Sequence, residues 1–115
     1  MKLTDNILTT LVRRGYAKKV RKIVEADITE PDRAYWYAWD VIHGRFPAME
    51  PAIGKSMWAY DYAYEIIDGP FPLGEHTIVR SDLAGHYYHL LLQGGYTEDA
   101  KRFKHLMESP EEWDR

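Results

Sequence analysis

The sequence predicts an all-α fold made of stacked helical repeats, and three observations lead to that prediction. Residues 34–53 and 59–78 repeat one another at an offset of 25 residues, a period typical of solenoid and array proteins. Apolar residues recur at helical spacing, and no segment shows the apolar–polar alternation of a strand. Of the 20 paired positions, 10 are identical: Ala34/Ala59, Tyr35/Tyr60, Tyr37/Tyr62, Ala38/Ala63, Ile42/Ile67, Gly44/Gly69, Phe46/Phe71, Pro47/Pro72, Glu50/Glu75 and Ile53/Ile78.

The first 28 residues are predicted to form a basic helical hairpin that precedes the repeats. Its second helix, over residues 17–26, is expected to bury Val20, Ile23 and Val24. Residues 1–27 contain seven basic and three acidic residues, whereas the remainder contains eight basic and fifteen acidic ones. Such asymmetry can mark a basic arm that binds nucleic acid or an acidic partner, but two solvated helix faces explain it more simply.

The first repeat unit is predicted to pair a long helix over residues 31–43 with a short helical turn over residues 48–54. Thr29 can cap the long helix, and Gly44 is expected to end it. Pro47 would prevent the helix from continuing. The buried face should consist of Ala34, Tyr37, Ala38, Val41 and Ile42, joined by Ile53 from the short turn.

The second unit follows the same plan, with Ser56 as the cap and a long helix over residues 57–68. Gly69 should stop this helix, and Ile78 should be buried by the short turn after it. The inward residues of the long helix are predicted to be Ala59, Tyr62, Ala63, Ile66 and Ile67.

A third, degenerate unit emerges when another 25 residues are added, with Ala84 and Tyr87 at the positions of Ala59 and Tyr62. Its second part should be a full helix over residues 98–107 that buries Ala100 and Phe103. Terminal units of a stack are expected to be atypical because they cap it. The chain is therefore interpreted as one domain, 1–115, with a hairpin at 1–28, about three repeats at 29–108 and a tail at 109–115.

The pattern AYxYAxxVIxGRFPxxEPxI resembles tandem repeats of small bacteriophage and bacterial proteins, which are mostly uncharacterised. The match covers residues 34–78 well and residues 81–103 loosely, and the hairpin falls outside it. The resemblance implies helical repeats and a phage or prophage origin. It carries over no catalytic residues.

The amino-acid composition limits the classes of function that this chain can have. The chain has no cysteine, which excludes disulfides, thiolate metal sites and cysteine nucleophiles. No apolar run approaches the roughly 18 residues of a membrane span. We therefore expect a protein of the cytoplasm, or of the host cytoplasm if it is phage-encoded, without membrane contact and without a cofactor.

Histidines and repeated acids are the residues that could carry chemistry. His86 and His89 stand three residues apart on one helix and could face a metal ion, but HxxH without a third ligand is a weak zinc motif. Glu50 and Glu75 could do acid–base work. A scaffold role is simpler, because an acid near the start of each short helix can accept backbone N–H bonds.

Aromatic residues off the buried stripes are the preferred binding candidates, because Tyr and Trp anchor protein interfaces. Stacking would place Tyr35 and Trp39 beside Tyr60 and Tyr64 as an aromatic ladder, and these rings could equally be packed between repeats. Positions that differ between units are expected to carry recognition. The candidate partner-binding residues are Tyr35, Trp36, Trp39, His43, Trp58, Tyr60, Asp61, Tyr64, Asp68 and His86.

The sequence thus favours a non-enzymatic protein–protein interaction module, with a host defence or regulatory factor as the partner if the chain is phage-encoded. An end-to-end homodimer is also compatible with the truncated last unit. A small His-based metalloprotein is one alternative. The other is a nucleic-acid-binding protein that uses the basic hairpin, through Arg13, Arg14, Lys18, Lys19, Arg21 and Lys22.

Overall fold

All regular elements of the described chain are helical, which confirms the prediction of an all-α fold. The computed structural model describes residues 17–113, with side chains from residue 21 onward. The longer elements are α2 (Ala17–Asp27), α7 (Ala84–Gln93) and α8 (Thr97–Met107). The remaining elements are α3 (Pro31–Tyr37), η1 (Ala38–Ile42), η2 (Pro47–Met49), α4 (Glu50–Gly54), α5 (Ala59–Asp61), η3 (Tyr62–Ile67), η4 (Pro72–Gly74), α6 (Glu75–Val79) and η5 (Pro110–Glu112).

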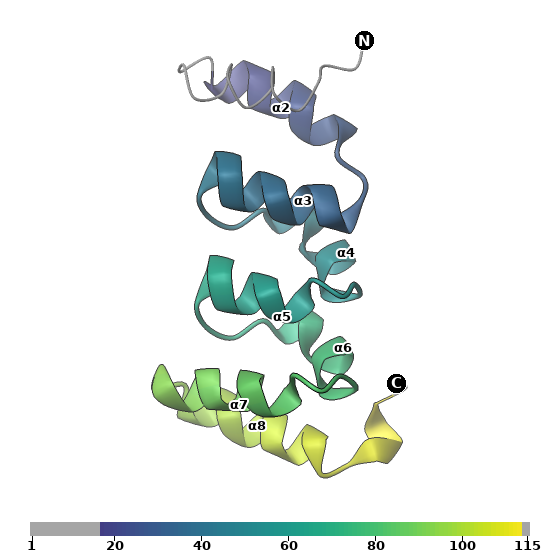
Figure 1. Cartoon of the computed structure of the whole chain (residues 1–115), viewed down its shortest axis with the longest axis vertical. Helices are drawn as coiled ribbons and strands as arrows, with labels where there is room; N and C mark the ends of the chain where they lie inside the picture. Colours follow the sequence, from purple (N-terminus) through teal and green to yellow (C-terminus); the bar gives the residue numbers. More distant parts are fainter. Residues whose placement is uncertain (1–16, 114–115) are drawn as a thin grey trace.

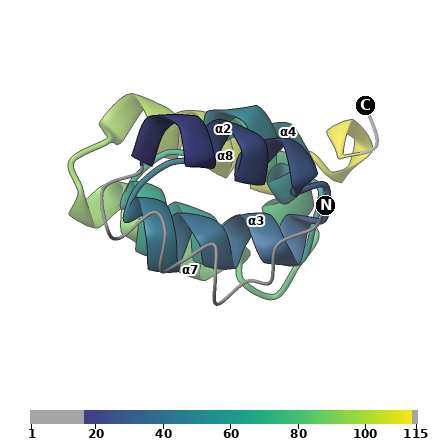
Figure 2. The same ribbon diagram turned by 90° about the horizontal axis from the view of Figure 1, so that it is seen from above.

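The helices form two layers along the longest axis of the molecule. In Figure 1, α3, α5 and α7 stack above one another. The first two are continued by η1 and η3. We call α3–η1, α5–η3 and α7 the long-helix layer. Seen from above, α2, α4 and α8 lie in a second layer, side by side with the first (Figure 2). The extents of 47 × 28 × 19 Å describe an elongated stack.

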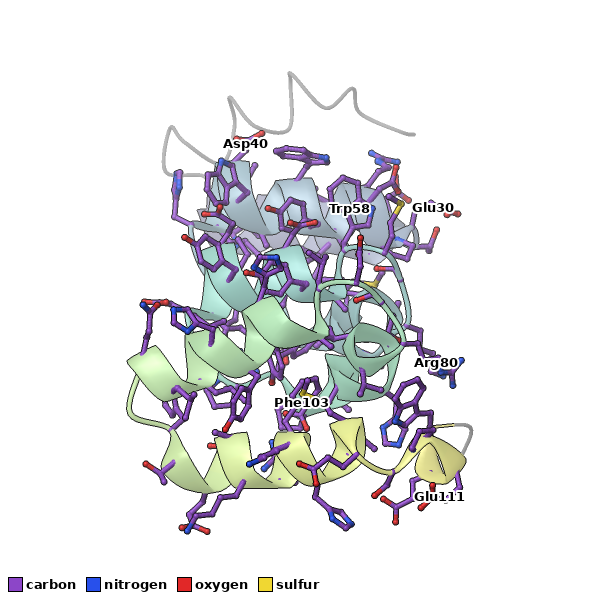
Figure 3. The ribbon with its side chains drawn as sticks, turned by 60° about the horizontal axis from the view of Figure 1, so that its bottom comes forward. Glu30, Asp40, Trp58, Arg80, Phe103 and Glu111 are labelled. Atoms are coloured by element: carbon purple, nitrogen blue, oxygen red, sulfur yellow. The ribbon has the colours of Figure 1, made fainter. Side chains whose placement is uncertain are left out.

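The core lies between the two layers and contains most of the residues that the periodicity placed there. Tyr62, Tyr87, Ile53, Ile78 and Phe103 are among the side chains that solvent barely touches. Phe103 points from α8 toward the neighbouring helices (Figure 3). Ring packing follows the repeat: Phe46 lies on Tyr37 and Phe71 lies on Tyr62, with centroids 5.5 and 5.1 Å apart. The phenylalanine of each turn thus packs on the long helix that precedes it.

The long helices of the first two units end close to the predicted residues, but through a conformation that was not predicted. Gly44 and Gly69 were expected to end these helices, and the residue before each of them, His43 or Asp68, adopts the left-handed conformation, with φ of 56° and 55°. The preceding turns, η1 and η3, are widened to π-helical spacing. The Gly44 N–H then bonds to the Ala38 carbonyl at 3.2 Å, and Gly69 repeats this bond with Ala63. The third unit lacks this ending, and there Gly95 has a φ of 80°.

Two glycines instead allow elements to approach closely. A Cβ on Gly54 would lie 2.5 Å from the Leu73 carbonyl oxygen, so α4 can contact η4 only because position 54 has no side chain. A Cβ on Gly74 would lie 2.7 Å from the Phe71 ring. These contacts seat one short helix on the next.

The expected N-terminal hairpin is described only in its second helix, α2. Val24 is buried as predicted, and Ile28 joins the core just after the helix ends. The prediction for Ile23 was wrong, because its side chain is 65% exposed. The first helix of the hairpin and the side chain of Val20 lie outside the described residues.

Candidate functional site

The repeated glutamates lie at the centre of a hydrogen-bond network that joins consecutive units. Glu50 is buried at the start of α4, where Tyr62 of the next long helix donates its hydroxyl to Oε2 at 2.7 Å. The same hydroxyl accepts the backbone N–H of Phe46 at 2.7 Å. Arg45 completes the site by donating to both carboxylate oxygens, each at 2.8 Å. A bidentate arginine compensates the burial of the carboxylate charge.

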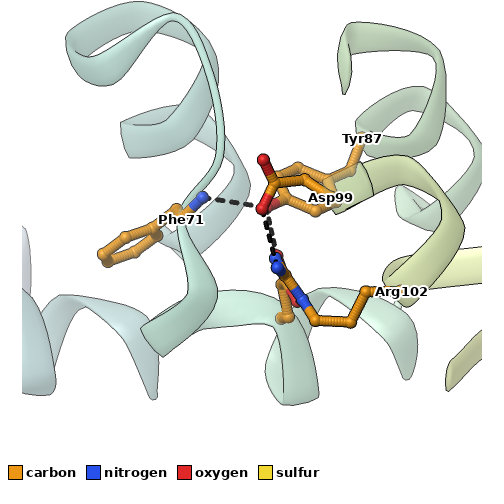
Figure 4. Close-up of polar contacts among 5 residues, drawn as sticks. Phe71, Tyr87, Asp99 and Arg102 are labelled. Carbon is orange, nitrogen blue, oxygen red and sulfur yellow. Dashed lines mark hydrogen bonds and ion pairs between the residues drawn. The ribbon is translucent and has the colours of Figure 1, made fainter. Parts of the chain in front are cut away.

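The second network has the same geometry but takes its arginine from elsewhere. Tyr87 donates to Glu75 at 2.7 Å and accepts the Phe71 N–H at 2.8 Å. Proline stands at position 70, where the previous unit has Arg45. Arg102 of α8 takes over and donates to the two oxygens of Glu75 at 3.2 and 2.6 Å. Its third contact is with Asp99, and Figure 4 shows these residues together.

A third network lies at the N-terminal end, which sequence analysis had placed outside the repeat. Tyr37 donates to Glu25 at 2.9 Å, and Arg21, one turn earlier in α2, donates to the same carboxylate at 2.9 Å. The 25-residue series of glutamates and of isoleucines is the signal that could have extended the repeat to α2. Those series are Glu25, Glu50, Glu75 and Ile28, Ile53, Ile78.

The electrostatics identify these networks as supports of the fold. The hydrogen bond from Arg45 holds the pKa of Glu50 below its ordinary value, so the carboxylate remains charged. Burial raises the pKa of the Tyr62 and Tyr87 hydroxyls, and it raises that of Tyr37 to about 12. The expectation that Glu50 and Glu75 accept backbone N–H groups was wrong, because Tyr and Arg side chains take those positions. Each network instead ties a helix of the second side of the stack, which is α2, α4 or α6, to the following helix of the long-helix layer.

The candidate aromatic residues form two clusters on the long-helix layer. In the first, Tyr35 stacks on Trp58 with centroids 5.0 Å apart, and Trp36 packs edge-on against both rings. Tyr35 is itself buried, whereas Trp36 is 48% exposed. This cluster therefore contains a structural ring, Tyr35, and an accessible one, Trp36.

The second cluster lies one unit further along the stack. Tyr60 stacks on Tyr64 with centroids 5.9 Å apart, and His86 lies 6.3 Å from the Tyr60 ring. The neighbouring Asp61 is partly buried, and that burial raises the pKa of its carboxyl group. Tyr35 and Trp39 were expected beside Tyr60 and Tyr64; in the structure Tyr35 stacks on Trp58, and Tyr60 stacks on Tyr64 of its own helix.

Two grooves open between the C-terminal ends of successive long helices. The first has a volume of about 330 Å³ and the second about 630 Å³. Glu65 lines both of them. The first is otherwise lined by Trp39, Asp40, His43, Gly44 and Ile66, and the second by Tyr64, Asp68, Leu90, Gln93, Gly94 and Tyr96. We call these the first and second inter-helix grooves.

Charge is unevenly shared between the two layers. The segments 31–43, 57–68 and 82–93 of the long-helix layer contain one basic residue, Arg33. Their acidic residues number six: Asp32, Asp40, Asp61, Glu65, Asp68 and Asp82. The intervening segments 45–55, 70–80 and 95–107 contain six basic and four acidic residues. The long-helix layer is thus the acidic and aromatic side of the stack.

The remaining candidates do not come together as a site. Arg13 and Arg14 and the side chains of Lys18 and Lys19 lie outside the described residues. Arg21 is engaged with Glu25, and Lys22 is exposed. His86 and His89 are both exposed, and the described residues contain no group of three or more His, Asp or Glu that could hold a metal ion.

The chain was compared with protein-family models, with curated proteins and with solved structures, and none of them matches it. Within residues 17–113, no helix has the length and apolar character needed to cross a membrane.

Proposed function

We propose that the protein is a non-enzymatic interaction module that binds a partner protein through its long-helix layer. The observation that carries this proposal is the exposure of large aromatic side chains on one layer. Trp36, Trp39 and Tyr64 are 48%, 39% and 50% exposed. Such side chains anchor protein interfaces because they bury a large area with few rotatable bonds.

The rest of the structure supports the same proposal. The buried glutamates are held by tyrosine and arginine, so the fold itself uses the repeated acids that were candidates for catalysis. Among the positions that differ between units, His43 and Asp68 are a related pair of exposed residues at the ends of the long helices. A constant scaffold with variable outward residues suits recognition of another protein.

The resemblance to phage and bacterial repeats leads us to propose a host protein as the partner. A defence or regulatory factor is the class that this origin would favour. The chain would then act by occupying a surface of that factor.

The test is affinity capture with a matched pair of surface variants. The double variant Trp36→Ser and Trp39→Ser removes two exposed rings from the long-helix layer, whereas Ile23→Ser removes an exposed apolar side chain from α2. A partner should be retained by the native chain and by Ile23→Ser and lost by the double variant, with all three folded by circular dichroism. Equal retention by all three would refute the proposed surface.

A further inference from the structure

The two inter-helix grooves are equivalent positions of successive units. Trp39 and Tyr64 are related by 25 residues and supply an aromatic ring to the first and second groove, respectively. Asp40 and Glu65 form the next related pair, and each lies one residue after the ring. Because Glu65 also lines the first groove from the facing helix, each groove combines a ring with two carboxylates.

The chemistry of the grooves suits a cation. An arginine or lysine side chain gains both from the face of a Trp or Tyr ring and from a nearby carboxylate. Glu25, Glu50, Glu75, Glu98, Asp99 and Glu112 form ion pairs in the described part of the chain, and none of these six residues lines either groove. The acidic residues of the whole layer add a negative potential that also attracts a cation.

We propose that the two grooves bind two arginine or lysine side chains from one extended segment of the partner protein. This inference rests on the proposed function and specifies the partner's chemistry. Neighbouring packed helices lie roughly 8–10 Å apart, which sets the separation of the grooves. A polyproline II segment rises about 3.1 Å per residue with three residues per turn. Its side chains at i and i+3 therefore point the same way about 9 Å apart, which matches that separation.

The probe is an eight-residue polyproline peptide with arginines at its third and sixth positions, titrated into the full chain and followed by NMR. We expect the Trp39 indole and the Glu65 amide signals to shift. Replacing both arginines by citrulline keeps the shape and removes the charge, and moving them to adjacent positions keeps the charge and removes the spacing. Both changed peptides should bind more weakly. Equal affinity for all three peptides would overturn the inference.

Glu65→Gln provides the matching change in the protein, because this residue lines both grooves. The dissociation constant for the arginine peptide should rise about two- to five-fold, the range for loss of an exposed charge pair. Asp82→Asn removes an exposed acid of the same layer outside the grooves and should leave affinity unchanged. Equal effects of the two variants would contradict recognition in the grooves.

The same variants separate this inference from the proposed function. If Glu65→Gln captures the cellular partner as well as the native chain does, while the Trp36 and Trp39 double variant loses it, the interaction surface is right and the cation recognition is wrong. If the double variant also retains the partner, the proposed function fails.

Discussion

At the scale of single residues, the tyrosine hydroxyls do the most to define this fold. Tyr62 is inaccessible to solvent, and its hydroxyl serves a backbone N–H and a carboxylate at once. A buried donor or acceptor without its partner carries a large desolvation cost. The Tyr62 hydroxyl therefore supplies a hydrogen-bond partner both to the Phe46 N–H and to the Glu50 carboxylate.

Tyr62→Phe is predicted to lower the free energy of unfolding by about 2 kcal/mol, because it leaves the buried Phe46 N–H without this acceptor and removes a donor from Glu50. Tyr64→Phe is the control, since this residue is 50% exposed and should change stability by less than about 0.5 kcal/mol. Urea denaturation of the two variants measures both values. Equal effects would show that the network contributes nothing.

The raised pKa of Tyr37 predicts a loss of stability in alkali. Its hydroxyl has a pKa of about 12 in the folded chain against 10.0 ordinarily, so the unfolded chain ionises first as pH rises. This contribution is fully present below pH 10 and is lost as pH rises toward 12, at about 1.4 kcal/mol for each unit in that window.

Denaturant unfolding of the native chain and of Tyr37→Phe at pH 8, 10 and 11 checks this prediction. The native chain should lose more stability than the variant between pH 10 and 11. Because Tyr62 and Tyr87 also have raised pKa values, the variant should keep part of the slope. Identical slopes would exclude a contribution from Tyr37.

At the scale of elements, much of the helix pattern follows from the sequence, whereas its endings do not. The alternation of long and short helices is set by apolar spacing, proline and glycine, and the bounds of α4 and α8 were close to expectation. The π-helical turns were not predicted, because the same residues are equally compatible with α-helical spacing. Tyr35 was expected off the buried stripe, but its ring is covered by Trp36 and Trp58. The contact with Trp58 depends on how successive units stack, which the periodicity of one helix does not show.

The left-handed ending of the second long helix makes Asp68 a position where glycine should be preferred. Asp68→Gly is predicted to raise the free energy of unfolding by roughly 0.5 kcal/mol, since a side chain at positive φ is strained. Asp61→Gly, within the same helix, should lower it by about 0.5–1 kcal/mol. Thermal unfolding of both variants tests the difference. A loss of stability in Asp68→Gly would mean that the aspartate side chain itself stabilises the ending.

At the scale of the whole molecule, the stack is held by contacts between consecutive units. The radius of gyration of 15.9 Å exceeds the roughly 13 Å expected for a compact domain of this length. Stability in such a stack is approximately a sum of unit and neighbour terms. The candidate site also arises where consecutive units meet, since both grooves lie between consecutive long helices. The repeat could suggest such a surface, but it could not show which side chains line it.

Arg102→Gln is therefore predicted to loosen one end of the stack. Removing the arginine leaves Glu75 buried with a single side-chain donor, Tyr87, and detaches α8 from α6. Amide hydrogen exchange in α7 and α8 should become at least several-fold faster, while exchange in α3 stays unchanged. A uniform acceleration along the chain would show instead that the stack unfolds as one unit.

The origin of the three arginines has a consequence for how such a chain can grow or shorten. Arg45 lies in the same unit as Glu50, the carboxylate that it neutralises. Glu75 is instead neutralised by Arg102, which lies in α8. Position 100, where a fourth glutamate would stand, is alanine. A unit that contains its own arginine can be duplicated without disturbing its neighbours. A unit with proline at that place needs an arginine from another element, which here is Arg102 of α8. The pair of Pro70 and Arg102 thus makes the unit of Glu75 dependent on α8 for its charge balance.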